Sequence, residues 1–247
     1  MFTPSSSPGA RLRLVCLPYA GGRSTAFHGW REALGPEVDV RVAVLPGRET
    51  RLREPSIERV HQLVPLLSDG LRDEIEPPFA LFGHSLGALV AYELTQHQLA
   101  TGRPLPERLL VSARRPPQLP QHETRLRFLD DDRFADEVHR LFGSIPEEVR
   151  RDQELLTLLL PALRADFGML ETYVYWPEPP LSLPIHAFGG AEDPWATPAE
   201  LRSWSALTTG PFDVEIVPGG HLFLLGAPPG LLSLVRERLG RPSGRAA

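Results

Sequence analysis

The chain has 247 residues, of which 42% are hydrophobic and 23% charged, and a formal net charge of −5; this composition fits a globular α/β protein and argues against broad nucleic-acid binding. The single cysteine, Cys16, excludes an internal disulfide framework and a cysteine-rich metal site and suits a reducing compartment. No secretory signal and no apolar run of membrane-spanning length is visible, so we expect a cytoplasmic protein that does not bind a membrane.

Strand-like and helix-like patterns alternate along the chain. Short apolar runs predict buried strands at residues 11–17, 38–45, 79–82, 109–112, 184–188 and 214–217. Helical patterns lie between most of these runs, at about 26–34, 56–75, 86–100, 198–206 and 229–239. This alternation predicts a mostly parallel central sheet flanked by helices, and we expect one domain over residues 1–247.

One segment between two predicted strands has no strand pattern of its own. Residues 121–176 contain the helical stretches RFADEVHRLFG and ELLTLLLPALRADFGMLETYVYW. Pro161 lies within the second stretch and should kink or divide that helix. We interpret the segment as a helical lid inserted over the carboxyl edge of the sheet; the alternative is a long crossover whose apolar residues are ordinary core.

A lone serine stands between two glycines in the stretch LFGHSLGALV. Gly83, Ser85 and Gly87 fit the pattern Gly-x-Ser-x-Gly, which here follows a strand pattern and precedes a helical one. A sharp turn at this place exposes the hydroxyl, and the glycines remove side chains that would collide with the adjacent strand and helix. Ser85 is therefore a candidate nucleophile; the alternative is that it only caps its helix.

A serine hydroxyl needs a base that accepts its proton, and the base needs an acidic partner. In a fold with this turn, the partners follow the serine in the order Asp or Glu, then His. Asp193 follows the predicted strand LPIHAF and His221 follows the strand DVEIV, so both should lie at the same sheet edge as Ser85. Glu192 is the alternative to Asp193. His84 is adjacent to Ser85, which makes it a poor candidate for the base.

Acyl transfer also needs hydrogen-bond donors for the oxyanion of its tetrahedral intermediate. One candidate donor is the backbone N–H of Leu86, at the start of the helix. The other is the N–H of Ala20 in the loop PYAGG, which otherwise is a glycine turn that ends a strand. Arg114 and Arg115 follow the strand LLVS and should also lie at the carboxyl edge, where ligands bind in such folds.

Several stretches together resemble the type II thioesterases of polyketide and nonribosomal-peptide assembly lines, namely CLPYAGG, LPGRETRLREP, LFGHSLGALVAYEL, RADFGMLETYVY, GGAEDPW and GGHLFLL. The resemblance covers the chain from about Arg11 to Leu239. It implies an α/β-hydrolase fold with a helical lid. It also implies a stand-alone serine hydrolase, without cofactor or metal, whose nucleophile, acid and base fall on Ser85, Asp193 and His221.

The resemblance further implies the substrates. Enzymes of this family remove acyl groups from the phosphopantetheine arm of acyl or peptidyl carrier proteins, which is an editing function. The resemblance also places the oxyanion donors on Ala20 and Leu86. Because carrier proteins are acidic, Arg114 and Arg115 become candidates for carrier docking. The apolar, strandless insertion makes Phe167 and Met169 candidates for lining the acyl chamber, although either could be ordinary core. The alternatives are a fatty-acyl-carrier thioesterase, an esterase or lactonase on the same fold, and a non-catalytic carrier-binding protein.

Overall fold

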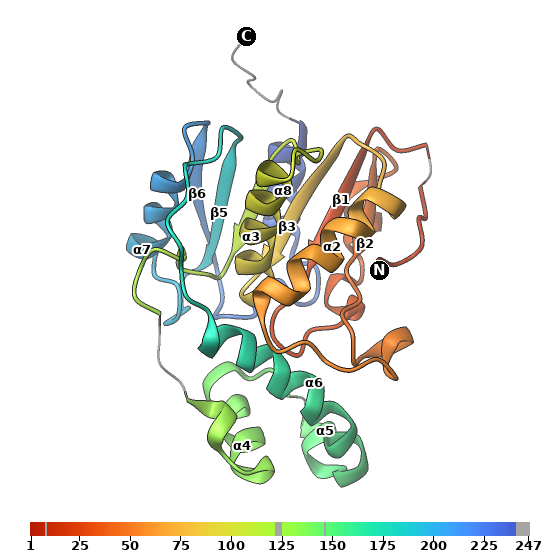
Figure 1. Ribbon diagram of the computed structural model, residues 1–247, viewed down its shortest axis with the longest axis vertical. Coiled ribbons are helices and arrows are strands. Elements are labelled where there is room, and N and C mark those ends of the chain that lie inside the picture. The colour runs from red at the N-terminus through yellow and green to blue at the C-terminus, as the bar shows by residue number, and fades with distance from the viewer. Residues whose placement is uncertain (8, 122–124, 146, 241–247) are drawn as a thin grey trace.

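The computed structural model describes residues 1–7, 9–121, 125–145 and 147–240, and its centre is a sheet of six parallel strands (Figure 1). The strands are β1 (Leu12–Leu17), β2 (Val38–Val42), β3 (Phe79–His84), β4 (Leu109–Ser112), β5 (Ile185–Gly190) and β6 (Phe212–Val217). Their order across the sheet is β2-β1-β3-β4-β5-β6, and each neighbouring pair is parallel. The predicted parallel sheet is thus confirmed.

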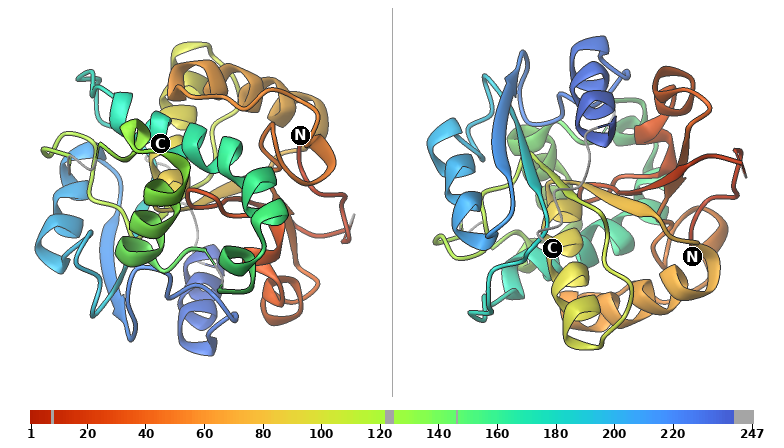
Figure 2. Two further views of the ribbon diagram at one scale, coloured as in Figure 1. Left: turned by 90° about the horizontal axis from the view of Figure 1, so that it is seen from below. Right: turned by 90° about the horizontal axis from the view of Figure 1, so that it is seen from above.

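Helices cover both faces of the sheet (Figure 2). One face carries α2 (Val60–Glu74), α3 (Leu86–Ala100), α7 (Pro198–Arg202) and the short 3-10 helix η4 (Ser203–Leu207); the other carries η1 (Ser24–Phe27), α1 (Trp30–Leu34) and α8 (Pro229–Gly240). Alternate residues of a strand therefore enter different cores, as Val15 and Leu14 of β1 do. Burial on both faces explains why the central strands β3 and β4 are nearly continuous apolar runs in the sequence, whereas the edge strands β2 and β6 also carry charged residues.

The chain between β4 and β5 is helical and lies at one end of the sheet, at the bottom of Figure 1. It comprises η3 (Leu126–Phe128), α4 (Asp131–Phe142), α5 (Glu147–Arg151) and α6 (Gln153–Thr172). We call these elements the helical segment. No strand is present in residues 125–145 and 147–172. Residues 122–124 and 146 of the predicted insertion lie outside the described residues.

No helix within the described ranges has both the length and the apolar character needed to cross a membrane.

Helix α6 continues through Pro161, so the proline does not divide the helix, and of the two expected effects only a kink stays a prediction. Proline removes one backbone hydrogen bond, here the bond to the carbonyl of Thr157. Pro161 and Thr157 are both exposed, so water can hydrate the freed carbonyl. Leu160 and Leu163 on the opposite side of α6 are buried against the protein, and this packing stabilises the helix across the proline.

Candidate active site

Ser85 alone forms the turn between β3 and α3. Its backbone φ is 55° and its ψ is −114°, a conformation that residues other than glycine rarely adopt. A Cβ on Gly83 would lie 2.1 Å from the carbonyl oxygen of Gly87, and a Cβ on Gly87 would lie 2.0 Å from that of Leu17. The glycines therefore allow the strand, the turn and the helix to pack closely, and the strained turn projects the serine side chain away from the helix.

A continuous set of hydrogen bonds joins Ser85, His221 and Asp193. The Ser85 hydroxyl and Nε2 of His221 are 2.9 Å apart, and Nδ1 of His221 is 3.0 Å from the Asp193 carboxylate. Since a carboxylate only accepts, Nδ1 carries the proton and Nε2 is left to accept from the serine hydroxyl. The side chains of His221 and Asp193 are only 8% and 0% exposed. The Ser85 side chain makes no capping hydrogen bond to α3, which disfavours a purely structural role.

The acidic partner of His221 is Asp193 and not its neighbour Glu192. Asp193 is buried and also accepts a hydrogen bond from the backbone N–H of Trp195 at 2.9 Å. Glu192 is exposed, and its backbone N–H donates to the carbonyl of Gly219 at 3.0 Å. This backbone contact joins the loops after β5 and β6, and it holds the acid and the histidine at the same sheet edge.

The two predicted oxyanion donors lie on backbone segments that contact each other. Leu86 begins α3, so its N–H has no acceptor within the helix. Ala20 lies in the loop after β1, where the N–H of Gly22 donates to the carbonyl of Tyr19 at 2.8 Å and closes a tight turn. The missing side chain of Gly87 is what allows the end of β1 to approach the start of α3. The role of these two N–H groups as oxyanion donors remains a prediction.

His84 is fully buried beside the site and supports the loop that carries His221. Its Nε2–H donates to the backbone carbonyl of His221 at 2.8 Å, and its Nδ1 accepts from the hydroxyl of Ser112 at 2.9 Å. Burial, and then the nearby His221, lower the pKa of His84 to about 3. The ring therefore stays neutral at physiological pH and keeps the tautomer that donates to the carbonyl.

Side chains of the helical segment cover Ser85 and His221. The ring of Phe142, at the end of α4, stacks on Trp195 with a centroid distance of 4.7 Å, and it also contacts Phe167 of α6 at 5.4 Å. Only a small cavity of about 40 Å³ is left beside Ser85. No local pattern in the sequence predicts that Phe142 contacts Trp195, because the contact joins segments that are far apart in the chain.

Comparison with known proteins identifies the family. The family model described as "Thioesterase domain" matches residues 12–239. The chain belongs to the thioesterase family. The gramicidin S biosynthesis protein GrsT of Aneurinibacillus migulanus is 39% identical to it over 215 residues, which are 87% of this chain and 84% of that protein.

Solved structures agree with this assignment. The RedJ thioesterase from the prodiginine biosynthetic pathway in Streptomyces coelicolor has a TM-score of 0.86 and 39% identity, and the match covers 94% of this chain and 87% of that one. The type II thioesterase BorB from the borrelidin biosynthetic cluster has a TM-score of 0.83 and 41% identity, with 94% of each chain covered. The protein is therefore a type II thioesterase with the α/β-hydrolase fold of this family.

Most of the predicted substrate-binding residues of this thioesterase line the small cavity at Ser85, namely Arg114, Arg115 and Phe167. Arg114 donates to Gln121 at 2.6 Å, and burial, followed by the charge of Arg115, lowers the pKa of Arg114 to about 10. Arg115 forms an ion pair with Glu200, and its side chain is only 13% exposed. Met169 is buried in the apolar core and does not line this cavity.

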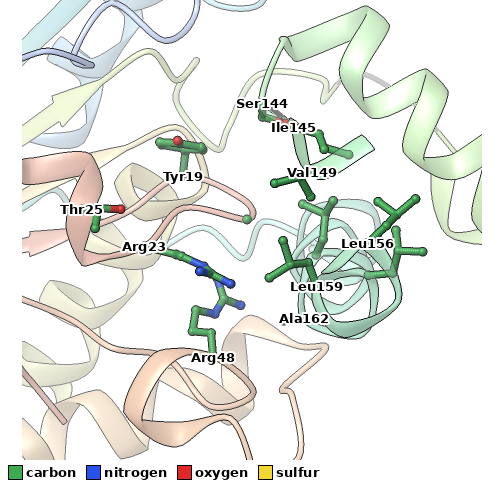
Figure 3. A pocket seen from close by; sticks show the side chains of 13 residues that line it. Tyr19, Arg23, Thr25, Arg48, Ser144, Ile145, Val149, Leu156, Leu159 and Ala162 are labelled. Atoms are coloured by element: carbon green, nitrogen blue, oxygen red, sulfur yellow. The ribbon is translucent and has the colours of Figure 1, made fainter. Parts of the chain in front are cut away.

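A larger cavity of about 290 Å³ lies between the loop after β1 and helices α5 and α6 of the thioesterase (Figure 3). One wall is aliphatic, with Ile145 between α4 and α5 and, from the helical segment, Val149, Leu156, Leu159, Leu160 and Leu163. The opposite wall is polar, with Tyr19, Arg23, Thr25 and Arg48. Gly21, the neighbour of Ala20, also lines this cavity, so an amphipathic molecule bound here would contact the predicted oxyanion loop.

Within the described residues, no group of three or more His, Cys, Asp or Glu could hold a metal.

Proposed function

We propose that this type II thioesterase hydrolyses acyl groups from the phosphopantetheine arm of acyl or peptidyl carrier proteins, as an editing step in polyketide or nonribosomal peptide synthesis. The observation that carries the proposal is the hydrogen-bonded set of Ser85, His221 and Asp193, with distances of 2.9 and 3.0 Å. The similarity to a gramicidin S biosynthesis protein and to a borrelidin-cluster thioesterase supports the pathway class.

The proposed acylation step transfers the acyl group to the serine. His221 accepts the proton of the Ser85 hydroxyl while the serine oxygen attacks the thioester carbonyl carbon. The N–H groups of Ala20 and Leu86 would stabilise the oxyanion of the tetrahedral intermediate. As this intermediate collapses, the C–S bond breaks and the protonated His221 gives its proton to the departing pantetheine thiolate. Asp193 stabilises the imidazolium while that proton is in transit.

The proposed deacylation step uses the same side chains, with a water molecule as the nucleophile and Ser85 as the leaving group. His221 accepts a proton from a water molecule, and the water oxygen forms a bond to the acyl carbon. The bond between that carbon and the serine oxygen then breaks, and Ser85 recovers its proton from His221. The free carboxylic acid and the unloaded carrier protein are the products. The side chains that carry out both steps belong to the protein itself.

We also propose that the chain is one domain in which the insertion at 121–176 acts as a lid. Two observations support this role. Phe142 and Phe167 of the helical segment border the cavity at Ser85, and the cavity holds only about 40 Å³, far less than the roughly 300–1,000 Å³ of ordinary ligand pockets. An acyl chain needs more room, so the helical segment has to move before the substrate reaches the serine. Phe167 then lies where it would line the acyl chamber.

Hydrolysis of a panel of acyl-loaded carrier proteins tests the proposal. The wild-type protein should release acids from carriers, and intact-mass measurement should detect an acyl adduct on the protein. Ser85→Ala should lower kcat by about 10⁴-fold or more and abolish the adduct, because the three residues act as a unit. Ser233→Ala is the matched control, since Ser233 is exposed on α8, and it should behave like the wild type.

Each alternative predicts a different outcome. Near-wild-type activity of Ser85→Ala would refute the serine mechanism. Faster turnover of simple esters or lactones than of carrier-bound thioesters would identify an esterase or lactonase. Preferred turnover of long fatty-acyl carriers would identify a fatty-acyl thioesterase. Carrier binding without turnover or adduct would identify a binding module.

A further inference from the structure

A buried carboxylate joins three separate parts of the chain beside the active site. Asp166 of α6 pairs with both terminal nitrogens of Arg48, at 2.8 and 2.6 Å. The same carboxylate accepts the backbone N–H of Gly21 at 2.7 Å, and Arg48 also donates to the carbonyl of Gly22 at 3.3 Å. The side chains of Arg48 and Asp166 are only 5% and 1% exposed. Figure 3 shows Arg48 on the polar wall of the larger cavity, opposite the helical segment.

The hydrogen bond to Gly21 fixes the peptide group that directly follows Ala20. A peptide group is planar, so fixing its N–H also fixes its carbonyl and thereby the ψ angle of Ala20. Gly21 has a φ of +78°, and a glycine in this loop would otherwise have wide backbone freedom. A Cβ on Gly21 would lie 2.5 Å from Cδ1 of Leu163, which shows that α6 packs directly on the loop. The backbone on the carboxyl side of Ala20 is thus held by contacts made by α6, and this restricts how the residue can lie in the loop.

We propose that Asp166 is a positioning residue for the oxyanion donor Ala20, and that Arg48 holds the Asp166 carboxylate in place for this role. The inference rests on the proposed serine mechanism. Neither residue lines the cavity at Ser85, so both act through the loop. The two hydrogen bonds from Arg48 fix the orientation of the Asp166 carboxylate, and the guanidinium compensates its negative charge. One oxygen of this carboxylate also accepts the Gly21 N–H. The oxyanion site is therefore assembled only while α6 lies on the loop.

The rate at which a small fluorophosphonate labels Ser85 tests this inference, because the reaction uses the nucleophile and the oxyanion site whatever the natural substrate is. Asp166→Asn keeps the size of the side chain but loses the charge. It should slow labelling by about 10- to 100-fold, the loss expected for a misplaced oxyanion donor. With a short acyl thioester, kcat should fall by a similar factor and KM should stay within about twofold, because the oxyanion contact forms only in the transition state.

A double variant distinguishes an effect of Asp166 on the Ala20 loop from an effect on the stability of the whole protein. In Arg48→Met/Asp166→Leu, apolar side chains replace the buried ion pair, which commonly preserves stability. Its thermal midpoint should be near that of the wild type, whereas labelling should stay slow because the Gly21 N–H has lost its acceptor. The control is Asp131→Asn, which removes the exposed ion pair of Asp131 with Arg164 of α6, at 2.7 Å, and should label normally.

The possible outcomes are distinct. Slow labelling in both the single and the double variant, with a normal control, supports the inference. Labelling within about twofold of the wild type in either folded variant overturns it. If Asp166→Asn does not fold, the double variant alone decides. Failure of the wild-type protein to label at Ser85 would refute the proposed serine mechanism, and the positioning role would fall with it.

Discussion

The ring of Phe142 lies against that of His221, with a centroid distance of 5.7 Å. A side chain from the helical segment thus covers the proposed base, and it also stacks on Trp195 next to the acid loop. Phe142 also lines the cavity at Ser85, which has a volume of only about 40 Å³. Substrate entry should therefore require Phe142 to move away from His221.

The first prediction concerns the size of the group that Ser85 accepts. Phe142→Ala removes the ring that covers the site, so a bulky fluorophosphonate should label Ser85 several-fold faster relative to a small one than in the wild-type protein. The measurement is the ratio of the two labelling rates. Phe128→Ala is the control, because Phe128 lies in the same helical segment but is 72% exposed. An unchanged ratio in Phe142→Ala would mean that Phe142 does not limit access.

The second prediction concerns the mobility of the helical segment. If it opens for substrate entry, the backbone amides of α4 and α6 should exchange with deuterium faster than those of β3 and α3, which lie at the centre of the sheet and its core. Hydrogen exchange followed by mass spectrometry measures both regions in one experiment. Occupancy of Ser85 by a bulky phosphonate should change exchange in α4 and α6 and leave β3 unchanged. Equal protection in both regions would indicate a rigid structural insertion.

How much of this site is predictable depends on how local its determinants are. The turn at Ser85 is encoded within five residues, Gly83 to Gly87, because glycines are needed at both close approaches. The meeting of Ser85, Asp193 and His221 follows from the parallel sheet, since residues after parallel strands share one edge. The central strands β3 and β4 were predictable because strands buried on both faces form apolar runs.

Other features were not predictable because they depend on contacts between distant segments. Arg48 and Asp166 are 118 residues apart in the chain, and nothing local in either stretch indicates that the two residues pair. Phe142 lies in a helix of mixed composition, where nothing local distinguishes it from a core side chain. Pro161 shows the opposite case, since a strong local signal for a helix break was overridden by packing of the buried face of α6.

The third prediction concerns the acid stability of the protein. Burial lowers the pKa of His84 from 6.5 to about 3, so between these values the unfolded chain binds a proton that the folded protein does not. His84 therefore reduces the free energy of unfolding as the pH falls below about 6.5, by up to about 1.4 kcal/mol per pH unit. In His84→Gln this contribution is absent, and the fall of stability with pH should be less steep.

Urea denaturation from neutral pH down to about pH 4 measures this slope. Gln can still donate to the His221 carbonyl, so His84→Gln is chosen to preserve the fold while it removes the titrating ring. The control is His28→Gln, because His28 is exposed, and it should keep the wild-type slope. Identical pH dependence in the wild type and in His84→Gln would show that the buried ring does not contribute.

The last prediction concerns Arg114 and Arg115. Docking of an acidic carrier protein, as expected from the sequence, would give a loss of kcat/KM on carrier substrates alone, and the loss would shrink as salt rises. Their surroundings favour a role inside the site instead. Arg115 is ion-paired with Glu200 and only 13% exposed, and both arginines line the cavity at Ser85. The net charge of −5 also opposes long-range attraction of an acidic partner.

We therefore expect Arg115→Ala to lower kcat/KM by about tenfold on both an acyl-carrier protein and a short acyl thioester without phosphate, because truncation removes the ion pair with the half-buried Glu200 and a side chain that lines the cavity at Ser85. The loss should depend only weakly on salt, since a partly buried pair is screened less than exposed charges. Arg114→Ala should behave in the same way. Arg133→Ala is the control, because the Arg133 side chain is 78% exposed on α4, and it should leave both substrates unaffected. A loss confined to the carrier substrate, and relieved by salt, would instead establish the two arginines as part of the carrier-docking surface.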